Sequence, residues 1–294
     1  MLDVKLILCP VDFSEFSERA YRHALSLAEH YRARLVALHV VDLLQFPSVS
    51  FAASAGLYDE CCQAVREAAR EQLQEFAKNH ARDDIQPKLV VQQGTAADSI
   101  LSFADIHKTD VIVMGTHGRR GYDRLMLGSV TDRVMRRAPC PVLAVCRPPH
   151  EPEATGKDHP AHHLHRILFC TDFSENSERA LIDAISVTAE YDGELTLLHV
   201  LEDAVPGSAK AEEDIAAAAL DKLIPPEQRK TLKVKTAVRI GKPYRQIIQL
   251  ALETQVDLVV MGVHGRGALD LAVFGSTTYR VMQLGPSPVL AVHV

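Results

Sequence analysis

The chain contains two copies of one sequence pattern, and this duplication limits the folds that are open to it. "DFSEFSERA" at 12–20 returns as "DFSENSERA" at 172–180, with eight of nine residues identical. "PCPVLAV" at 139–145 returns as "PSPVLAV" at 286–292. The offset between the copies is 160 residues as far as the "LHV" segments and 147 residues beyond them. We therefore expect two similar domains, the first with 13 extra residues around "QFPSVSFAASAGL".

Each copy alternates apolar runs with stretches of helical periodicity. Runs such as "KLILCPV" and "RILFCT" predict buried strands, and Ser14 or Ser17 (Ser174 or Ser177) is a candidate N-cap for the helix that follows. Strands that are apolar throughout indicate a parallel sheet covered on both faces. With right-handed crossovers, the prediction is an α/β fold of two doubly wound, Rossmann-like domains.

The domain boundary is predicted from composition. The stretch "RPPHEPEATGKDHPAHH" is rich in Pro, His and Glu and has no apolar periodicity, which is typical of a linker. We expect a first domain over 1–147, a linker over 148–163 and a second domain over 164–294.

Composition excludes several classes of protein. The chain has 294 residues, 47% hydrophobic and 24% charged, with a net charge of −6, which argues against a general nucleic-acid binder. No apolar run approaches the roughly 20 residues of a membrane helix, and the N-terminus does not read as a secretory signal, so we expect a cytoplasmic protein. None of the six cysteines forms a C-x-x-C pair, which favours reduced, buried thiols. A redox switch at Cys61–Cys62 is the alternative.

A glycine motif raises the question of function. "MGTHGRRGYDRLMLGSV" at 114–130 and "MGVHGRGALDLAVFGST" at 261–277 have the same spacing. Glycines let main-chain N–H groups approach an anion, and Gly-Ser opens a helix whose N-terminus attracts negative charge. Ser129 can cap that helix or face a phosphate. The motif is neither a Walker loop nor a dinucleotide fingerprint, since these glycines follow the fourth strand. A simple turn kept by the duplication stays open as the other interpretation.

Three segments of each copy should meet at one edge of the sheet. Ligands of such sheets bind beyond the carboxyl ends of the strands, where the strand order switches direction. In the first copy these ends carry Asp12, Val40-Val41 and Met114-Gly115. The second copy offers Asp172, Val200-Leu201 and Met261-Gly262. An apolar strand edge could hold a flat base, with main-chain groups at its rim, while the carboxylate could accept hydrogen bonds from ribose or base.

The whole chain resembles a tandem universal stress protein. The resemblance rests on "PVDFSEFSERA" and "CTDFSENSERA", on "LHVV" and "LHVL", on "APCPVLAV", and on the family's G-x2-G-x9-G-[ST] motif, present twice. It implies a five-stranded parallel sheet in each domain and pairing of the two domains through their last strands, as an intramolecular pseudo-dimer.

The resemblance also implies a ligand, because many members with the intact motif bind ATP, some hydrolyse it slowly, and members without the glycines do not bind it. Magnesium would accompany the nucleotide. The implied site of the first domain comprises Pro10, Val11, Asp12, Val40, Val41, Met114, Gly115, Gly118, Arg119, Gly128, Ser129 and Val130. That of the second comprises Cys170, Thr171, Asp172, Val200, Leu201, Met261, Gly262, Gly265, Arg266, Gly275, Ser276 and Thr277.

The two loops differ in charge, and we expect unequal affinities. The first loop holds Arg119, Arg120 and Arg124, whereas the second holds Arg266, which favours the first site for a triphosphate. Asp132, three residues after Ser129 as in a capping box, would oppose this by competing for the same N–H groups. Neutral Tyr279 takes its place in the second copy.

The resulting hypothesis is an ATP-binding, nucleotide-gated regulator with at most slow hydrolysis, since no motif for a water-positioning base is present. His117 and His264 lie inside the glycine motif, so they are either candidates for such a base or residues that pack the loop. His39 and His199 are most simply interpreted as structural residues. A nucleotide-independent adaptor that docks a partner protein is the alternative. A metal site at His159, His162, His163 and His165, or a redox sensor, is a lesser one. The sequence does not identify the partner protein. It also leaves open whether two chains associate into a homodimer.

Overall fold

The computed structural model describes residues 3–43, 58–82, 84–118, 126–146, 164–202, 209–263 and 275–293. The elements of the first half are β1 (Leu6–Pro10), α1 (Glu15–Tyr31), β2 (Arg34–Val41), α3 (Tyr58–Asn79), β3 (Lys88–Gln93), α4 (Ala96–Ile106), β4 (Val111–Gly115), α5 (Ser129–Arg137) and β5 (Val142–Val145). Those of the second half are β6 (Arg166–Thr171), α6 (Glu175–Glu190), β7 (Glu194–Leu201), α7 (Ala209–Leu223), α8 (Pro226–Arg229), β8 (Lys233–Ile240), α9 (Pro243–Glu253), β9 (Leu258–Gly262), α10 (Ser276–Leu284) and β10 (Val289–Val292).

The strand order confirms the doubly wound prediction. The order is β3-β2-β1-β4-β5 in the first half and β8-β7-β6-β9-β10 in the second. Every pairing within a half is parallel. The order reverses direction between β1 and β4, and again between β6 and β9. These two switch points are the places where a ligand of such a sheet binds.

The two halves share one ten-stranded sheet. Its central pair is β5 with β10, which run antiparallel in the register Ala144↔Val289, Leu143↔Leu290 and Val142↔Ala291. All six of these side chains are buried. The last strands therefore pair within the chain, as the sequence resemblance implied.

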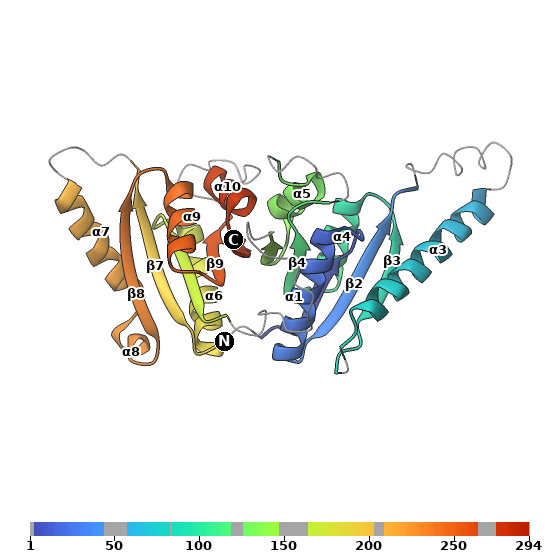
Figure 1. Cartoon of the computed structure of the whole chain (residues 1–294), viewed down its shortest axis with the longest axis horizontal. Helices are drawn as coiled ribbons and strands as arrows, with labels where there is room; N and C mark the ends of the chain where they lie inside the picture. The colour runs from blue at the N-terminus through green and yellow to red at the C-terminus, as the bar shows by residue number, and fades with distance from the viewer. Residues whose placement is uncertain are drawn as a thin grey trace.

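Each face of the sheet carries one layer of helices (Figure 1). Buried residues of α4, α5, α9 and α10 form one core with alternate residues of the strands. Those of α1, α3, α6 and α7 form the other core with the intervening strand residues. Each core contains residues from both halves, so neither half buries its apolar surface alone. In Figure 1, α3 and α7 lie at the two outer ends, and α5 and α10 face each other near the centre.

The predicted helix boundaries agree closely with the structure. Ser14 caps α1 and Ser174 caps α6, each accepting a hydrogen bond from an N–H three residues on. The helices α3 and α7 run over Tyr58–Asn79 and Ala209–Leu223, between the second and third strands of each half. The short helix α8 was not predicted, although a proline at its first turn is a known start signal. The 13 extra residues and the linker lie outside the described residues.

The central strand pair should govern the stability of both halves together. Leu290→Ala removes a side chain that is 7% exposed at this pair, and we expect a loss of roughly 2–4 kcal/mol in the free energy of unfolding. Urea unfolding should still show one transition, because both cores cross the pair. Leu284→Ala, at a side chain that is 47% exposed, is the matched control and should change stability by less than about 0.5 kcal/mol. Two separate transitions in the wild type would contradict the shared-core description.

Candidate functional site

The carboxyl ends of β1 and β4 meet at the switch point of the first half. Asp12 lies two residues beyond the end of β1, and Gly115 is the last residue of β4. In the second half β6 and β9 are in direct register at Cys170↔Met261, which brings Asp172 and Gly262 to the same edge. The structure thus brings together the strand-end residues that the sequence singled out in each copy.

Two hydrogen bonds tie the glycine loop to the strand in each half. In the first half the Gly128 N–H donates to the Thr116 carbonyl at 2.9 Å, and Thr131 Oγ1 donates to the Gly115 carbonyl at 2.9 Å. The second half repeats both bonds, from Gly275 to Val263 at 3.0 Å and from Thr278 to Gly262 at 2.9 Å. The start of α5 or α10 is therefore held against the end of its strand. The threonine was not selected from sequence, although its repetition at the same place was visible.

Two glycines of the first half lie close to neighbouring groups. A Cβ on Gly115 would lie 2.8 Å from the backbone of Phe16, at the start of α1, so glycine is required there. A Cβ on Gly118 would lie 2.8 Å from Asp12 Oδ2, so a larger residue would displace that carboxylate. The described start of the loop therefore places main chain close to the Asp12 carboxylate. Arg119, Gly265 and Arg266, predicted for these loops, lie outside the described residues, as do Arg120, Arg124 and His264.

The first turn of α5 differs from the sequence prediction. Gly128, not Ser129, is the N-cap, and no side chain caps the helix; Ser129 is the first helical residue and is exposed. Asp132 does not form a capping box, because it lies one residue too far along the helix and its carboxylate pairs with Arg136 at 2.9 and 3.0 Å. The predicted competition of Asp132 for the helix N–H groups is therefore wrong. Gly275 and Ser276 take the same places in α10.

A strained turn holds Asp12 in position. Asp12 Oδ1 accepts hydrogen bonds from the N–H of Ser14 at 3.0 Å and from its Oγ at 2.6 Å. Phe13, between them, has φ 64°, an unusual conformation for a bulky residue. Its ring packs on His39 at 4.5 Å, and His39 Nδ1 lies 2.7 Å from the Val11 carbonyl. The structural interpretation of His39 is thus supported by its contacts.

The second half repeats this turn. Asp172 Oδ1 accepts from the Ser174 N–H at 3.1 Å and from its Oγ at 2.6 Å. Phe173 has φ 60°, and its ring lies 4.5 Å from that of His199. Strain of this kind persists where the surroundings over-determine the backbone, and it concentrates at functional sites. Sequence reasoning missed the left-handed phenylalanine; the repeated "DFSE" was the available signal.

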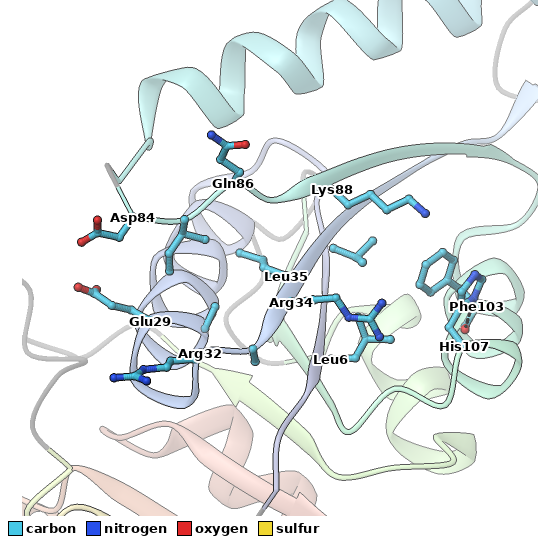
Figure 2. Close-up of a pocket in the computed structure, with 14 residues that line it drawn as sticks. Leu6, Glu29, Arg32, Arg34, Leu35, Asp84, Gln86, Lys88, Phe103 and His107 are labelled. Atoms are coloured by element: carbon cyan, nitrogen blue, oxygen red, sulfur yellow. Dashed lines mark hydrogen bonds between the residues drawn. The ribbon is translucent and has the colours of Figure 1, made fainter.

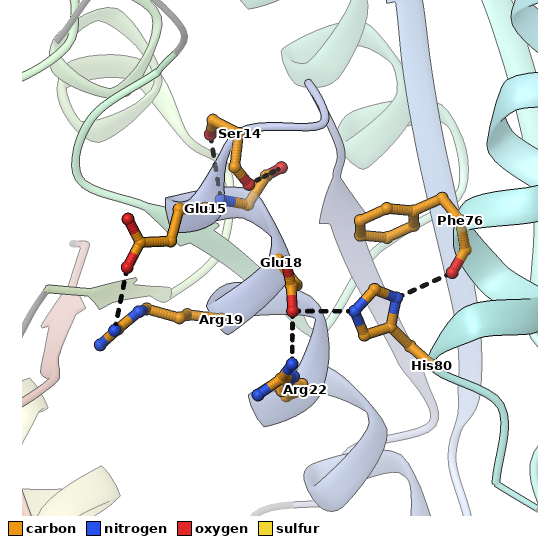
Figure 3. A network of polar contacts seen from close by, with 8 residues as sticks. Ser14, Glu15, Glu18, Arg19, Arg22, Phe76 and His80 are labelled. Atoms are coloured by element: carbon orange, nitrogen blue, oxygen red, sulfur yellow. Dashed lines mark hydrogen bonds and ion pairs between the residues drawn. The ribbon is translucent and has the colours of Figure 1, made fainter. Parts of the chain in front are cut away.

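The helix that follows this turn is anchored to α3 (Figure 3). Glu18 in its first turns pairs with Arg22 and, at 3.0 Å, with His80 beyond the end of α3. His80 Nδ1 lies 2.8 Å from the Phe76 carbonyl, which orients the imidazole. Burial alone would raise the pKa of Glu18, but His80 and Arg22 lower it below its usual value. These contacts restrain the helix whose N-terminal turn carries Asp12.

His117 packs inside the first glycine loop. Its Nδ1 lies 2.9 Å from Thr116 Oγ1, and its ring lies 5.0 Å from that of Phe16. Burial lowers the pKa of His117, and the backbone of Met126 opposes that shift without reversing it. The imidazole is therefore neutral at pH 7 and serves as a packing element of the loop.

The remaining predicted residues that the structure describes lie at the strand ends or at the start of α5 and α10. Buried or half-buried positions at the strand ends are Pro10, Val11, Val40, Val41 and Met114 in the first half, and Thr171, Val200, Leu201 and Met261 in the second. The Val41 carbonyl accepts the Gly94 N–H at 3.1 Å, and Leu201 accepts from Gly241 in the same way. Val130 and Thr277 are half-buried second residues of α5 and α10.

A groove among the described residues lies elsewhere. It encloses about 660 Å³ at the amino ends of β1, β2 and β3. Figure 2 shows Arg34 and Lys88 on the side of Phe103 and His107, with Glu29, Arg32 and Asp84 on the other side. Its charges are mixed, and it lies at the edge of the sheet opposite the switch point. The groove is thus separate from the strand ends that carry Asp12 and Gly115.

The cysteines behave as buried thiols. Cys9, Cys62, Cys140, Cys146 and Cys170 are buried, Cys61 is half-buried, and none of these six described residues forms a disulfide. Burial raises the pKa of Cys140 to about 12 and raises those of Cys9 and Cys170 as well. A thiol with a raised pKa is a poor nucleophile.

Among the residues that the structure describes, no group of His, Cys, Asp and Glu side chains is placed to hold a metal ion. His159, His162 and His163 fall outside those residues. In the same part of the chain, every helix is too short or too polar to cross a membrane.

Comparison with known proteins gives a consistent result. The sequence model of the universal stress protein family matches residues 4–145 and again 163–293. A universal stress protein of Mycolicibacterium smegmatis is 27% identical over 297 residues, covering 98% of this chain and 96% of that one. One from Methanocaldococcus jannaschii is 34% identical over 147 residues, covering 50% of this chain and 85% of that protein. The crystal structure of a universal stress protein from Archaeoglobus fulgidus superposes with a TM-score of 0.68 at 22% identity, covering 98% and 96% of the two chains.

The capping contact of Ser14 gives a stability prediction. Ser14→Ala removes the acceptor of the Ser17 N–H and the hydroxyl that bonds Asp12, so we expect a loss of about 0.5–2 kcal/mol in the free energy of unfolding. Urea unfolding measures it. Ser102→Ala, at an exposed serine within α4, is the control and should stay within about 0.5 kcal/mol of wild type. Equal effects of the two changes would argue against the cap.

The buried imidazole of His117 gives a pH prediction. Because its folded pKa is lowered, the unfolded chain binds the proton more tightly. The stability from neutral His117 is fully present above the ordinary pKa of about 6.5 and is lost as pH falls through that value toward the folded pKa. NMR titration should give His117 a pKa below 6.5, and His117→Gln should flatten the stability profile between about pH 5 and 7. A pKa above 6.5 would contradict the burial argument.

Proposed function

The chain belongs to the universal stress protein family, and we propose that it is an ATP-binding member that acts as a nucleotide-gated regulator of the stress response. One observation carries the proposal: the same cradle is built twice, at both switch points. In each, an aspartate held by a strained turn faces a strand end whose glycine carbonyl is tied to the first turn of a helix. Duplication alone can explain why the two copies share the same residues. A loop that only connects two elements, however, would need neither the strained backbone at Phe13 nor a glycine packed against a carboxylate.

We assign the parts of the nucleotide to the chemistry of each wall. The apolar ends of β2 and β7, with Val40 and Val200, suit the base. Asp12 and Asp172 are oriented acceptors for the ribose hydroxyls. The phosphates suit Gly118 and the helix start at Gly128 and Ser129, where the N–H groups of the first turn of α5 have no side-chain cap and favour negative charge. Magnesium, bound with the nucleotide, would neutralise phosphate charge.

Hydrolysis, if it occurs, should be slow. A fast enzyme needs a group that positions the attacking water and others that neutralise the transition state. In the described part of the site, Asp12 is held by two hydrogen bonds from Ser14, and His117 is packed into the loop with a lowered pKa. Neither is placed as a mobile base. Regulation would then depend on whether the nucleotide is bound and not on how fast it is hydrolysed.

Other parts of the proposal rest on the family resemblance and on composition. We propose domain limits of 1–147 and 164–294 with a linker over 148–163, and a cytoplasmic location. A protein partner, whose identity nothing in the chain indicates, would read the nucleotide state. Nucleic acid and membrane are not proposed as partners.

Titration with magnesium ATP tests the proposal. The nucleotide-stripped protein should bind two equivalents per chain in isothermal titration calorimetry. Gly128→Val and Gly275→Val should each remove one equivalent, lowering that affinity at least about tenfold, because a branched side chain would cover the helix N–H groups. The fold should survive, since a Cβ on Gly128 would lie 3.4 Å from the Thr116 carbonyl, an ordinary contact.

Circular dichroism and urea unfolding of both variants provide the control for folding. Folded wild-type protein that binds no nucleotide, or a double variant that binds as wild type does, would overturn the proposal. The nucleotide-independent adaptor would then be the leading function.

A further inference from the structure

The helix at the first nucleotide site is bonded at both ends by residues of the second half. Just before its start, the Leu127 N–H donates to Tyr279 Oη at 3.1 Å. At its last turn, the Met135 carbonyl lies 2.7 Å from His293 Nε2. These contacts join residues 152 and 158 positions apart in the chain. Figure 1 shows the helices α5 and α10 facing each other across the centre of the molecule.

The backbone of Tyr279 lies in the helix that begins at the second site. It lies in the first turns of α10, three residues after Ser276, and its N–H donates to the Gly275 carbonyl at 2.9 Å. One residue is therefore bonded through its backbone to the glycine that opens α10 and through its hydroxyl to the loop that opens α5. Gly128, the N-cap of α5, directly follows Leu127.

We propose that Tyr279 is a positioning residue that couples the two nucleotide sites, holding the phosphate-binding turn of the first half from the second half. The inference rests on the proposed nucleotide function and names a regulation of the same sites. Nucleotide bound at the start of α10 would immobilise the turn that carries Tyr279. The Leu127 amide, and with it the Gly128–Ser129 turn, would be ordered before the first site is filled.

The hydrogen bond stabilises the structure because the amide that it satisfies belongs to a buried residue. Leu127 is 6% exposed, and both its side chain and the Tyr279 ring pack in the core that contains α5 and α10. A buried N–H without an acceptor costs free energy, and a loop in that state relaxes toward other conformations. The N–H groups that face phosphate would move with it.

The two halves carry different residues at the repeat position of Tyr279. The counterpart of Tyr279 in the first half is Asp132, whose carboxylate pairs with Arg136 on its own helix. That hydrogen bond raises the pKa of Arg136, and the nearby Tyr279 adds to the effect. The tyrosine is thus a feature of the second half alone and not a residue that the fold requires at this position. The energetic coupling it creates is nevertheless reciprocal between the two sites.

Tyr279→Phe is the test, because it removes the hydroxyl and keeps the packed ring. The site of the second half is first blocked with Gly265→Val, which leaves the Gly275 carbonyl bonded to residue 279. In that background, Tyr279→Phe should weaken binding of magnesium ATP to the remaining first site by about 5- to 50-fold. With the first site blocked by Gly118→Val, the same change should alter affinity less than about twofold.

The matched control is Asp132→Asn in the Gly118→Val background. It alters the repeat counterpart of Tyr279 and should leave the second site within about twofold of its starting affinity. Equal weakening of both sites by Tyr279→Phe would indicate general loosening and overturn the coupling. So would no change at either site.

A readout without nucleotide separates this inference from the proposed function. Hydrogen exchange by NMR should show a protected Leu127 amide in the wild type and at least about tenfold faster exchange in Tyr279→Phe. If the folded wild type binds no magnesium ATP, the proposed function fails, and the positioning role fails with it even if the amide is protected. If ATP binds but exchange and affinity do not respond to Tyr279→Phe, only the coupling is overturned.

Discussion

The antiparallel pairing of β5 with β10 is the contact on which the rest of the structure depends. It joins two five-stranded sheets into one, and both apolar cores continue across it from one half to the other. On the face of α1 and α6, the His30 ring adds a stacked contact on Tyr191 at 4.1 Å. Because neither half ends in an independent core, the relative placement of the two glycine loops follows from this pairing.

Each candidate site combines local strain with close backbone approach. A left-handed phenylalanine costs of order 1–3 kcal/mol, and here it sets the aspartate beside the loop in both halves. The compensating contacts are the serine cap, the ring of the neighbouring histidine and the carbonyl that this histidine bonds. The result is an aspartate whose carboxylate is held by the N–H and hydroxyl of Ser14 and lies close to the start of the glycine loop.

The duplication does not make the halves equivalent. Asp132 and Tyr279 occupy the same repeat position, yet one forms an ion pair within its helix and the other bonds the opposite half. A difference of one side chain can therefore convert two copied sites into a pair with a defined physical link.

The sequence by itself determined the order of the elements, the burial of both sheet faces, and the glycine loops after the fourth strands. These follow from local periodicity and from the repeat. For α1 and α6 it offered two candidate capping serines each, and the structure selects Ser14 and Ser174. For Ser129 it offered a cap of α5 or a phosphate contact, and the capping alternative is wrong because Gly128 is the N-cap. Only the tertiary structure decided that the Thr131 hydroxyl bonds Gly115, that Gly118 abuts Asp12, and that Tyr279 reaches Leu127. Such contacts join residues up to 152 positions apart, so they form only when the strands have paired, including β5 with β10 at the centre of the sheet.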